Sequence, residues 1–412
     1  MRKCTLMVVA LVLLAMPARA DLPQFLGPNN TGEAPGVKLA RSWPKDGPKV
    51  LWTLRTGPGF GGPAIHQGKV YLLDRDGRSG DVLLCIDLKT GKESWRFAYR
   101  APGRLSYDGS RSTPAVDNKY VFTIGPFGHV YCVDKASHKA VWKKELATDF
   151  GSKRPNWGFS QSVLLYKEHA IIAPLSGRVG VAALEKATGK VVWTSKPVGP
   201  MRYMSPLLTT LAGVEQVIVA SHRQTAGVDP ATGKVLWTYG GFRCNIPVPS
   251  PVHVGGGRVF ITGGYGAGSV MIQVTKVGGR FAVKELFRLK RLGCHIHPPL
   301  VYKDHLYAQF NTKRTKDGLA CVDLEGNVKW KTGRSPNFDW GGLVLADGLI
   351  LAMDGSSGVL RLIEPGPAGY KELASARLLS RPRIWGPMAL TDGKLVCRDQ
   401  REMKCVEVGA KP

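Results

Sequence analysis

The chain has 412 residues and a formal net charge of +26 at neutral pH, and 43% of its residues are hydrophobic. The length allows a large folded core, and all-β rings of this size often form a single unit. So basic a surface favours anionic partners, such as phospholipid or lipopolysaccharide head groups, acidic glycans or acidic proteins.

The first 20 residues have the pattern of a signal peptide. A short basic stretch precedes an almost wholly apolar run over residues 5–16, and Ala18-Arg19-Ala20 gives the small-x-small pattern of a cleavage site. The run is too short to remain in a bilayer, and no later stretch is long and apolar enough to cross one. We therefore expect cleavage after Ala20, a periplasmic or secreted protein, and no transmembrane segment. Export also argues against nucleic acid as the natural partner.

One motif, acid-x-x-Thr-Gly-Lys-x-x-Trp, recurs along the rest of the chain. It spans residues 87–95, 185–193 and 229–237, with a degenerate copy at 134–142 and a shortened one at 323–330. The tryptophans lie 47, 51, 44 and 93 residues apart, and the last interval equals two periods. The motif is typical of a β-hairpin, in which glycine takes a positive φ and the tryptophan that follows can pack against a neighbouring unit.

A second marker gives the number of repeats. Each repeat opens with a small residue followed by proline or an apolar residue, about 46 residues apart on average. The eight pairs are Gly62-Pro63, Thr113-Pro114, Ser162-Val163, Ser205-Pro206, Ser250-Pro251, Pro298-Pro299, Gly342-Leu343 and Gly386-Pro387. Short β-branched and aromatic runs follow each pair, and no stretch has helical periodicity. Four short strands per period predict an eight-bladed β-propeller.

The two ends of the repeat region complement each other. Lys49-Val50-Leu51-Trp52-Thr53 repeats residues 234–238 one for one, but no inner strands precede it, whereas residues 386–408 lack a closing tryptophan strand. Pairing the two segments leaves no open sheet edge. We therefore predict an all-β chain with a single eight-bladed propeller of four-stranded antiparallel blades over residues 49–412. The N-terminal strand completes the last blade, and residues 21–48 form a lead-in.

The Thr-Gly-Lys-x-x-Trp repeats resemble those of the PQQ-like, quinoprotein alcohol dehydrogenase-like propellers over nearly the whole chain after residue 20. The stretch Pro23-Gln24-Phe25-Leu26-Gly27-Pro28 is similar to the start of many exported bacterial members. The family includes quinone-dependent dehydrogenases and non-catalytic relatives, among them the propeller lipoprotein of the outer-membrane β-barrel assembly machine. Because the motif builds blades, the resemblance implies the fold and leaves the function open.

Most signatures of the dehydrogenases are missing from the sequence. Many of those enzymes carry two adjacent cysteines beside the quinone, and those with a fused haem domain carry Cys-x-x-Cys-His; neither pattern occurs. No carboxylate and amide set for the calcium ion of these enzymes can be matched. A lipid-attachment cysteine after the signal is missing as well.

We therefore expect a monomeric, non-catalytic binding or scaffold protein of the cell envelope that uses no cofactor. Its partners would be envelope proteins or anionic envelope components. The alternative is a dehydrogenase of small alcohols or sugars that uses PQQ with calcium. A hydrolase or a lyase is a further alternative, because propellers host these activities too.

Residues that precede each predicted inner strand rim the funnel of a propeller, which is the usual ligand site. Aromatic side chains with arginine, histidine and amide groups suit a planar or anionic ligand. Packing inherited from the repeat is the alternative for the Trp-Gly pairs among them. The candidates are Tyr107, Asp108, Arg111, Trp157, Gln161, Tyr203, Asn245, His295, His297, Asp339, Trp340, Arg383 and Trp385.

The cysteines are interpreted as packing residues. Cys85, Cys132, Cys321 and Cys405 each stand two residues before an acid, at a position that other repeats fill with alanine or glycine. Two pairs are left open: Cys397 could face Cys405 across the last hairpin, and Cys244 and Cys294 could be free thiols or a bridge.

Two further patterns could suggest a site. His295 and His297 with Cys294 could begin a metal site, but no third or fourth ligand follows, so no metal is predicted. The glycine-rich stretch at residues 263–269 lacks the lysine of a phosphate loop and a following helix, which favours a mobile hairpin.

Overall fold

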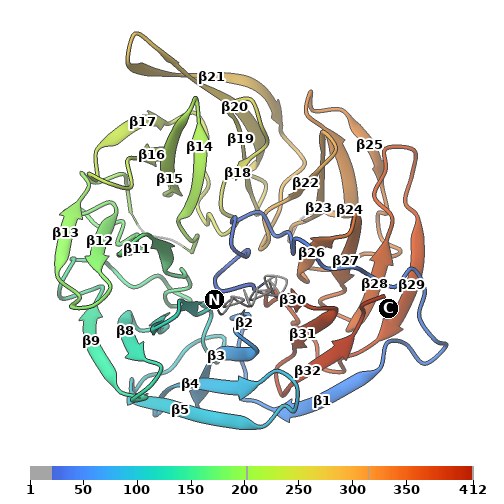
Figure 1. Ribbon diagram of the computed structural model, residues 1–412. Coiled ribbons are helices and arrows are strands. Elements are labelled where there is room, and N and C mark those ends of the chain that lie inside the picture. Colours follow the sequence, from blue (N-terminus) through green and yellow to red (C-terminus); the bar gives the residue numbers. More distant parts are fainter. Residues whose placement is uncertain (1–20, 201–202, 314, 411–412) are drawn as a thin grey trace, which may run out of the picture.

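The computed structural model describes residues 21–200, 203–313 and 315–410. They form eight four-stranded antiparallel sheets, arranged as blades around a central axis, and contain no helix (Figure 1). The predicted eight-bladed propeller is confirmed. The predicted signal peptide, residues 1–20, lies outside the described residues. No helix among the described residues is long and apolar enough to cross a membrane.

Each blade runs from an inner strand at the axis to an outer strand at the rim. The first four blades are β2 (Ala64–His66), β3 (Lys69–Asp76), β4 (Gly80–Asp87), β5 (Glu93–Arg100); β6 (Ala115–Val116), β7 (Tyr120–Ile124), β8 (His129–Asp134), β9 (Ala140–Glu145); β10 (Leu164–Tyr166), β11 (His169–Ile172), β12 (Ala182–Glu185), β13 (Val191–Thr194); and β14 (Leu207–Leu211), β15 (Val214–Ala220), β16 (Thr225–Val228), β17 (Val235–Tyr239). The last four are β18 (Val252–His253), β19 (Arg258–Gly263), β20 (Gly268–Val277), β21 (Arg280–Leu289); β22 (Leu300–Tyr302), β23 (His305–Asn311), β24 (Lys316–Asp323), β25 (Val328–Lys331); β26 (Leu343–Ala346), β27 (Leu349–Met353), β28 (Val359–Ile363), β29 (Glu372–Arg377); and β30 (Ala389–Thr391), β31 (Lys394–Arg398), β32 (Glu402–Glu407) with β1 (Val50–Arg55).

Strand β1 closes the ring, as the sequence predicts. It pairs antiparallel with β32, so the last sheet has the order β1-β32-β31-β30, and Figure 1 shows the blue β1 beside the red β32. Trp52 of β1 lies opposite Cys405 of β32. Its indole Nε1 donates a hydrogen bond of 2.8 Å to the carbonyl oxygen of Leu88 in the first blade. The N-terminal strand thus joins the last blade and contacts the first.

The repeated tryptophans make the same contact between neighbouring blades around the ring. Trp142 and Trp193 donate from Nε1 to carbonyl oxygens of the following blade, at 2.8 and 3.2 Å. The turn glycine of the next blade lies on the indole, so a Cβ on Gly91 would lie 2.6 Å from the Trp52 ring. In the degenerate copy His138 takes the glycine's place and stacks on Trp95 at 4.9 Å between ring centroids. The motif is therefore an inter-blade contact as well as a turn.

Four of the seven cysteines that the structure describes occupy the small position opposite these tryptophans. Cys85 pairs with Trp95 and Cys132 with Trp142, and the seven cysteines in the described part of the chain are free and buried. Cys397 and Cys405 do not form a disulfide. On the paired strands β31 and β32, Cys397 lies opposite Lys404, the residue before Cys405. Adjacent residues of a strand point to opposite faces of the sheet. Cys397 shares a face with Lys404, so its thiol and that of Cys405 lie on opposite faces.

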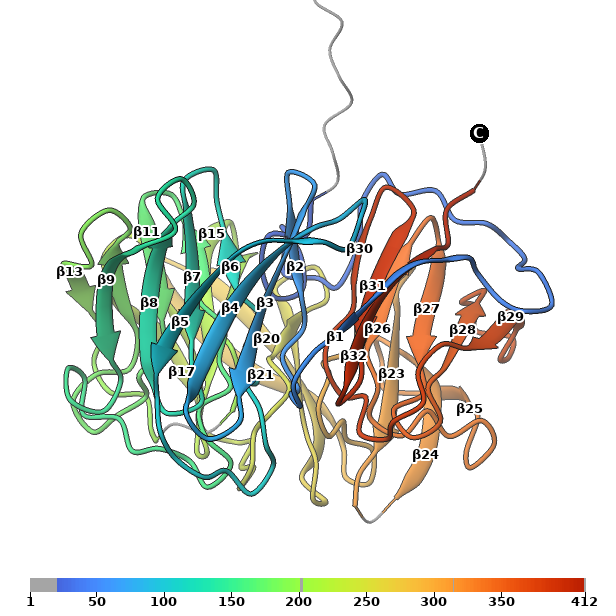
Figure 2. The same ribbon diagram turned by 90° about the horizontal axis from the view of Figure 1, so that it is seen from below.

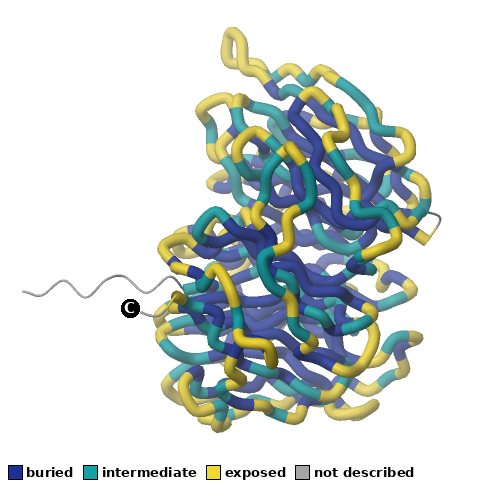
Figure 3. Tube along the Cα trace, turned by 90° about the vertical axis from the view of Figure 1, so that its right-hand side faces the viewer, coloured by how far each residue is buried: buried dark blue, intermediate teal, exposed yellow. Residues whose placement is uncertain are grey.

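The hydrophobic core lies between adjacent blades. One cluster joins Val70 of the first blade, Leu351 of the seventh and Val396 of the eighth, all fully buried. In Figure 3 the buried residues follow the blade interiors, while exposed residues gather in the loops and at the outer edges. Because every blade buries both faces against its neighbours, the ring positions the axial loops rigidly.

Small residues at the start of the repeats link the blades around the axis. The backbone N–H of Thr113 donates to Ser162 Oγ at 3.0 Å, and that of Ser162 donates to Ser205 Oγ at 2.9 Å. On the other half of the ring the backbones touch directly, and a Cβ on Gly62 would lie 2.6 Å from the carbonyl oxygen of Pro387. The second sequence marker is therefore the residue that allows inner strands to approach the axis.

The lead-in crosses one mouth of the central channel. Gln24 Oε1 accepts a hydrogen bond of 3.1 Å from the backbone N–H of Leu165 in the third blade, and Asn30 Oδ1 accepts one of 3.1 Å from Leu208 in the fourth. Backbone bonds tie the same segment to the second and seventh blades. In Figure 2 this dark-blue segment lies on the upper side of the ring. The lead-in thereby covers this mouth, and the loops at the opposite mouth surround the candidate site.

Candidate functional site

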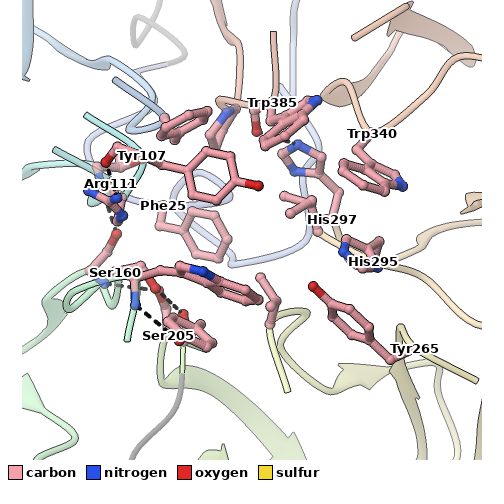
Figure 4. A pocket seen from close by; sticks show the side chains of 18 of the residues that line it. Phe25, Tyr107, Arg111, Ser160, Ser205, Tyr265, His295, His297, Trp340 and Trp385 are labelled. Carbon is pink, nitrogen blue, oxygen red and sulfur yellow. Dashed lines mark hydrogen bonds between the residues drawn. The ribbon is translucent and has the colours of Figure 1, made fainter. Parts of the chain in front are cut away.

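The central channel holds a cavity of about 160 Å³ (Figure 4). Its wall comes mainly from the loops that connect the outer strand of one blade to the inner strand of the next, and Phe25 of the lead-in contributes to it as well. The lining residues are Phe25, Phe60, Tyr107, Arg111, Thr113, Trp157, Ser160, Ser162, Tyr203, Ser205, Val248, Tyr265, His295, Ile296, His297, Lys313, Trp340, Trp385 and Pro387.

Six aromatic side chains form a closed ring around this cavity, which we name the aromatic collar. Each comes from a different inter-strand connection, so none is a sequence neighbour of another. Successive ring centroids lie 6.3, 6.4, 4.6, 4.2, 4.9 and 6.1 Å apart. Five of these separations are within the usual range of aromatic pairs, and the His295–Trp340 stack is slightly closer. In order the members are Tyr107, Trp157, Tyr265, His295, Trp340 and Trp385.

Contacts with two further lining aromatics and with one carboxylate fix the tryptophans of the collar. Phe60 stacks on Trp385 at 5.3 Å, and Tyr203 stacks on Trp157 at 5.2 Å between ring centroids. The indole Nε1 of Trp385 also donates a hydrogen bond of 3.0 Å to Asp339 Oδ2. A ligand would therefore meet aromatic walls that are already ordered, which lowers the entropic cost of binding.

The charged side chains of the lining are cations. Arg111 and Lys313 line the cavity, and no aspartate or glutamate does. The Arg111 guanidinium donates to the carbonyl oxygens of Gly109 and Tyr107, and burial lowers its pKa to about 10, so it stays charged at neutral pH. The Lys313 ammonium lies 5.3 Å from the ring centroid of Tyr265. The cavity therefore favours anionic over cationic groups.

The two histidines of the lining are neutral at physiological pH. Burial lowers the pKa of both His295 and His297 to about 4, and two nearby lysines add to the effect on His295. His297 Nε2 lies 2.9 Å from the carbonyl oxygen of Trp385, so Nε2 carries the proton and donates. His295 Nδ1 and Thr113 Oγ1 are buried without a hydrogen-bond partner among the described residues. His295 Nδ1 lies against the turn between β19 and β20, where a Cβ on Gly264 would be 2.3 Å from it, so this nitrogen does not face the cavity space.

Most of the residues predicted from the sequence meet in this cavity. They come from six of the inter-blade loops, brought to one mouth by the ring. The predicted residues on the lining are Tyr107, Arg111, Trp157, Tyr203, His295, His297, Trp340 and Trp385.

The other five predicted residues do not line the cavity. The Gln161 amide bonds both ways to the backbone of Ala173, at 2.9 and 2.8 Å, and so holds its own blade together. Asn245 lies in a separate hollow with two arginines, and Asp339 lies behind the collar on Trp385. Asp108 and Arg383 are exposed, and the Arg383 guanidinium lies 5.5 Å from the ring centroid of Tyr107.

Tyr265, Phe60, Lys313 and Phe25 line the cavity but were not predicted. Tyr265 belongs to the glycine-rich stretch expected to be a hairpin, which forms the turn between β19 and β20. Glycine is required there because a Cβ on Gly264 would lie 2.3 Å from His295 Nδ1. Turns between second and third strands lie at the same mouth as the predicted loops, and this topology was the signal that could have found Tyr265 and Lys313.

Cys294, His295 and His297, considered above as the start of a metal site, have other roles in the structure. Cys294 is fully buried, and its backbone N–H donates to Thr262 Oγ1 at 2.8 Å, while both histidines belong to the cavity wall. Across the described ranges, no group of three or more histidine, cysteine or acidic side chains is placed to hold a metal ion.

Residues 78–332, more than half of the chain, match the family model described as outer membrane protein assembly factor BamB. The chain belongs to this family of PQQ-like propellers. A quinoprotein alcohol dehydrogenase, PedH of Pseudomonas putida, is 24% identical over 167 residues, which are 38% of this chain and 27% of PedH. The chain thus spans little more than a quarter of that relative's length. The family resemblance drawn from the repeats is confirmed.

Two kinds of solved propeller are similar to the structure. BamB from Moraxella catarrhalis has 15% sequence identity and a TM-score of 0.58, over 87% of this chain and 99% of that one. Quinohemoprotein alcohol dehydrogenase from Comamonas testosteroni has 14% identity and a TM-score of 0.61, over 95% and 81%. At such identities the similarity concerns the fold alone, so the function has to be argued from the cavity.

Proposed function

We propose that this PQQ-like propeller is a non-catalytic binding protein of the cell envelope, and that its ligand or partner enters the collared cavity. The predicted signal peptide and the match to an outer membrane assembly factor support the envelope location. The observation that carries the non-catalytic part is the set of donors on the cavity wall.

PQQ with calcium does not fit this wall. Calcium takes about six to eight oxygen ligands, with carboxylate and amide oxygens prominent among them. The lining offers hydroxyl groups of serine, threonine and tyrosine, and no carboxylate or side-chain amide. Of the nearby carboxyl groups, that of Asp339 accepts from Trp385 Nε1, and Asp108 is exposed. A divalent cation would also meet the positive charges of Arg111 and Lys313.

What remains is a cavity suited to binding. The collar supplies flat apolar surfaces, Arg111 supplies a fixed positive charge, and two neutral histidines supply polar atoms without adding charge. The ring of blades holds these groups in place, so an entering molecule exchanges water for an ordered wall. Binding and orientation need nothing more, whereas hydride transfer to a quinone would need a bound and polarised cofactor.

The competing dehydrogenase function gives the direct test. PQQ with CaCl₂ is added to the purified protein, and the melting temperature and dye reduction with an alcohol or an aldose are measured. The proposal expects no shift and no turnover, since a ligand raises the melting temperature only when it binds the native state. A shift that Arg111→Ala abolishes, together with PQQ-dependent dye reduction, would establish the dehydrogenase instead. Recovery of the chain in the cytosol with residues 1–20 intact would contradict the envelope location.

A further inference from the structure

We propose that the cavity binds a free, single-ring aromatic acid, with the ring inside the aromatic collar and the carboxylate on Arg111. This proposal rests on the binding function proposed above and names the chemical class of the ligand. Three observations support it: the size of the cavity, the closed aromatic wall and the sign of the charge.

The size of the cavity matches a ligand part of about one ring. An engineered protein cavity of roughly 150 Å³ holds one benzene molecule, and this cavity has about 160 Å³. Phe25 lies on the lining next to the covered mouth, and the lead-in that carries it is hydrogen-bonded to the third and fourth blades. A molecule of several fused rings would have to displace the collar or the lead-in or extend out of the open mouth, whereas one ring fits inside the collar.

The wall recognises a planar ring from several sides. His295 stacks on Trp340 at 4.2 Å with 15° between their planes, while Tyr107 meets Trp157 edge to face at 88°. An entering ring therefore finds both faces and edges of aromatic groups, which are the two arrangements that aromatic pairs prefer. A saturated ring of the same size would gain only apolar contact.

The charge pattern selects an anion and places it at Arg111. A guanidinium has five N–H donors, and the bonds of Arg111 to Gly109 and Tyr107 engage only part of them. In Figure 4 Arg111 lies on one side of the cavity, across from His295 and Tyr265. A carboxylate on the ring can accept from this arginine while the ring contacts the collar. No lining carboxylate would repel it.

Loops at the same mouth add a positive field. Arg104, Lys153, Arg223, Arg334 and Arg381 are exposed, and none forms an ion pair with a residue that the structure describes. The exposed acid Asp108 at the same mouth offsets part of this charge. A cleft with an excess of positive charge raises the local concentration of anions, and salt weakens this effect. The field therefore favours anionic ligands before they reach Arg111.

The test uses benzoate as the probe, with the full mature chain in calorimetric titrations at low salt. The matched probes are cyclohexanecarboxylate, which keeps the charge and loses the aromatic ring, and benzylamine and benzyl alcohol, which keep the ring and lose the negative charge. We expect one benzoate per chain, bound at least tenfold more tightly than any of the three. Equal binding of any matched probe, or no benzoate binding at millimolar concentration, would overturn the proposal. These comparisons need no variant, so they do not depend on a mutant's folding.

Variants then locate the carboxylate. Arg111→Gln should lower the affinity for benzoate at least tenfold and change the affinity for benzyl alcohol by no more than twofold. The control is Arg381→Gln, because Arg381 is exposed and outside the lining, and it should change neither affinity by more than twofold. If the two variants lost the same amount of benzoate affinity, the positive charge of the whole mouth would account for the binding, and the assignment of the carboxylate to Arg111 would be refuted. A pentapeptide with one tyrosine between glutamates forms a further arm, and binding of this peptide without benzoate would mean protein recognition in place of a free acid.

The outcomes separate this proposal from the binding function itself. Failure of benzoate with no PQQ-dependent dye reduction would refute the aromatic-acid ligand and leave the non-catalytic function standing. PQQ-dependent turnover would refute the non-catalytic function whether or not benzoate binds.

Discussion

Replacement of Trp52 by alanine tests how strongly the ring depends on the N-terminal strand. Trp52 is 8% exposed, its Nε1 donates a buried hydrogen bond of 2.8 Å to Leu88, and its ring lies against Gly91. Truncation of a buried tryptophan costs about 3–5 kcal/mol, and the lost hydrogen bond to the Leu88 carbonyl accounts for about 1 kcal/mol of this. We therefore expect Trp52→Ala to lower the free energy of unfolding by about 4 kcal/mol, a large part of a usual total of roughly 5–15 kcal/mol.

Urea unfolding, followed by tryptophan fluorescence and by circular dichroism, measures this loss. Trp52→Phe keeps most of the packing and removes the donor, so it should cost about 1–2 kcal/mol. Val50→Ala on the same strand is the control, because Val50 is 45% exposed, and it should stay within about 0.5 kcal/mol. A loss below about 1 kcal/mol for Trp52→Ala would refute closure through this side chain.

Three further predictions concern the turns, the cysteines and the histidines. Gly91→Ala should cost about 1–3 kcal/mol, since φ is +71° and the Cβ would lie 2.6 Å from the Trp52 ring, and clearly more than Gly278→Ala, whose Cβ meets nothing within 4 Å. Cys85→Ala should cost about 1 kcal/mol and leave ligand binding unchanged, because other blades carry alanine or glycine at that position. Acid should destabilise the fold from about pH 6.5 down to about pH 4, because the pKa of His297 is about 4 in the folded chain and about 6.5 in the unfolded one.

The sign of the pH effect follows from proton binding. Below pH 6.5 the unfolded histidine takes up a proton that the folded one does not, so stability is complete above that pH and is lost as the pH falls toward 4. At pH 5 the free energy of unfolding should be about 2 kcal/mol lower for each such histidine. The difference in the free energy of unfolding between pH 7 and pH 5 should therefore be about 2 kcal/mol smaller in His297→Gln than in the unchanged protein. An unchanged difference would contradict a buried neutral His297. Equal costs at Gly91 and Gly278, or a ligand-binding defect in folded Cys85→Ala, would contradict the other two predictions.

The fold could be predicted because its sequence markers have structural roles that repeat. The motif tryptophan bonds to the next blade, as Trp142 does to Lys186, and the small residue at each repeat start brings inner strands together, as Ser162 does. Even the degenerate turn keeps this contact between blades, because His138 stacks on Trp95 where glycine stands elsewhere. A pattern that must recur for the ring to close is visible in one sequence.

The cavity could be predicted only in part, for two physical reasons. Position before an inner strand places a residue at the correct mouth but does not orient its side chain, and Gln161 turns its amide to the backbone of Ala173 instead. Phe25 lies outside the repeats, and its place on the lining follows from the path of the lead-in, which the hydrogen bonds of Gln24 and Asn30 fix. The repeat pattern of the sequence does not predict the path of a segment that lies outside the repeats.

The most direct test of the non-catalytic function is the content of the native protein. The protein is purified from the cells that produce it, without added ligand, and is then denatured; the absorption spectrum and the calcium content of the released material are measured against the protein concentration. A cavity wall of cations, neutral histidines and hydroxyl groups predicts no quinone and no calcium in proportion to the chain. One quinone and one calcium ion released per chain would contradict the account.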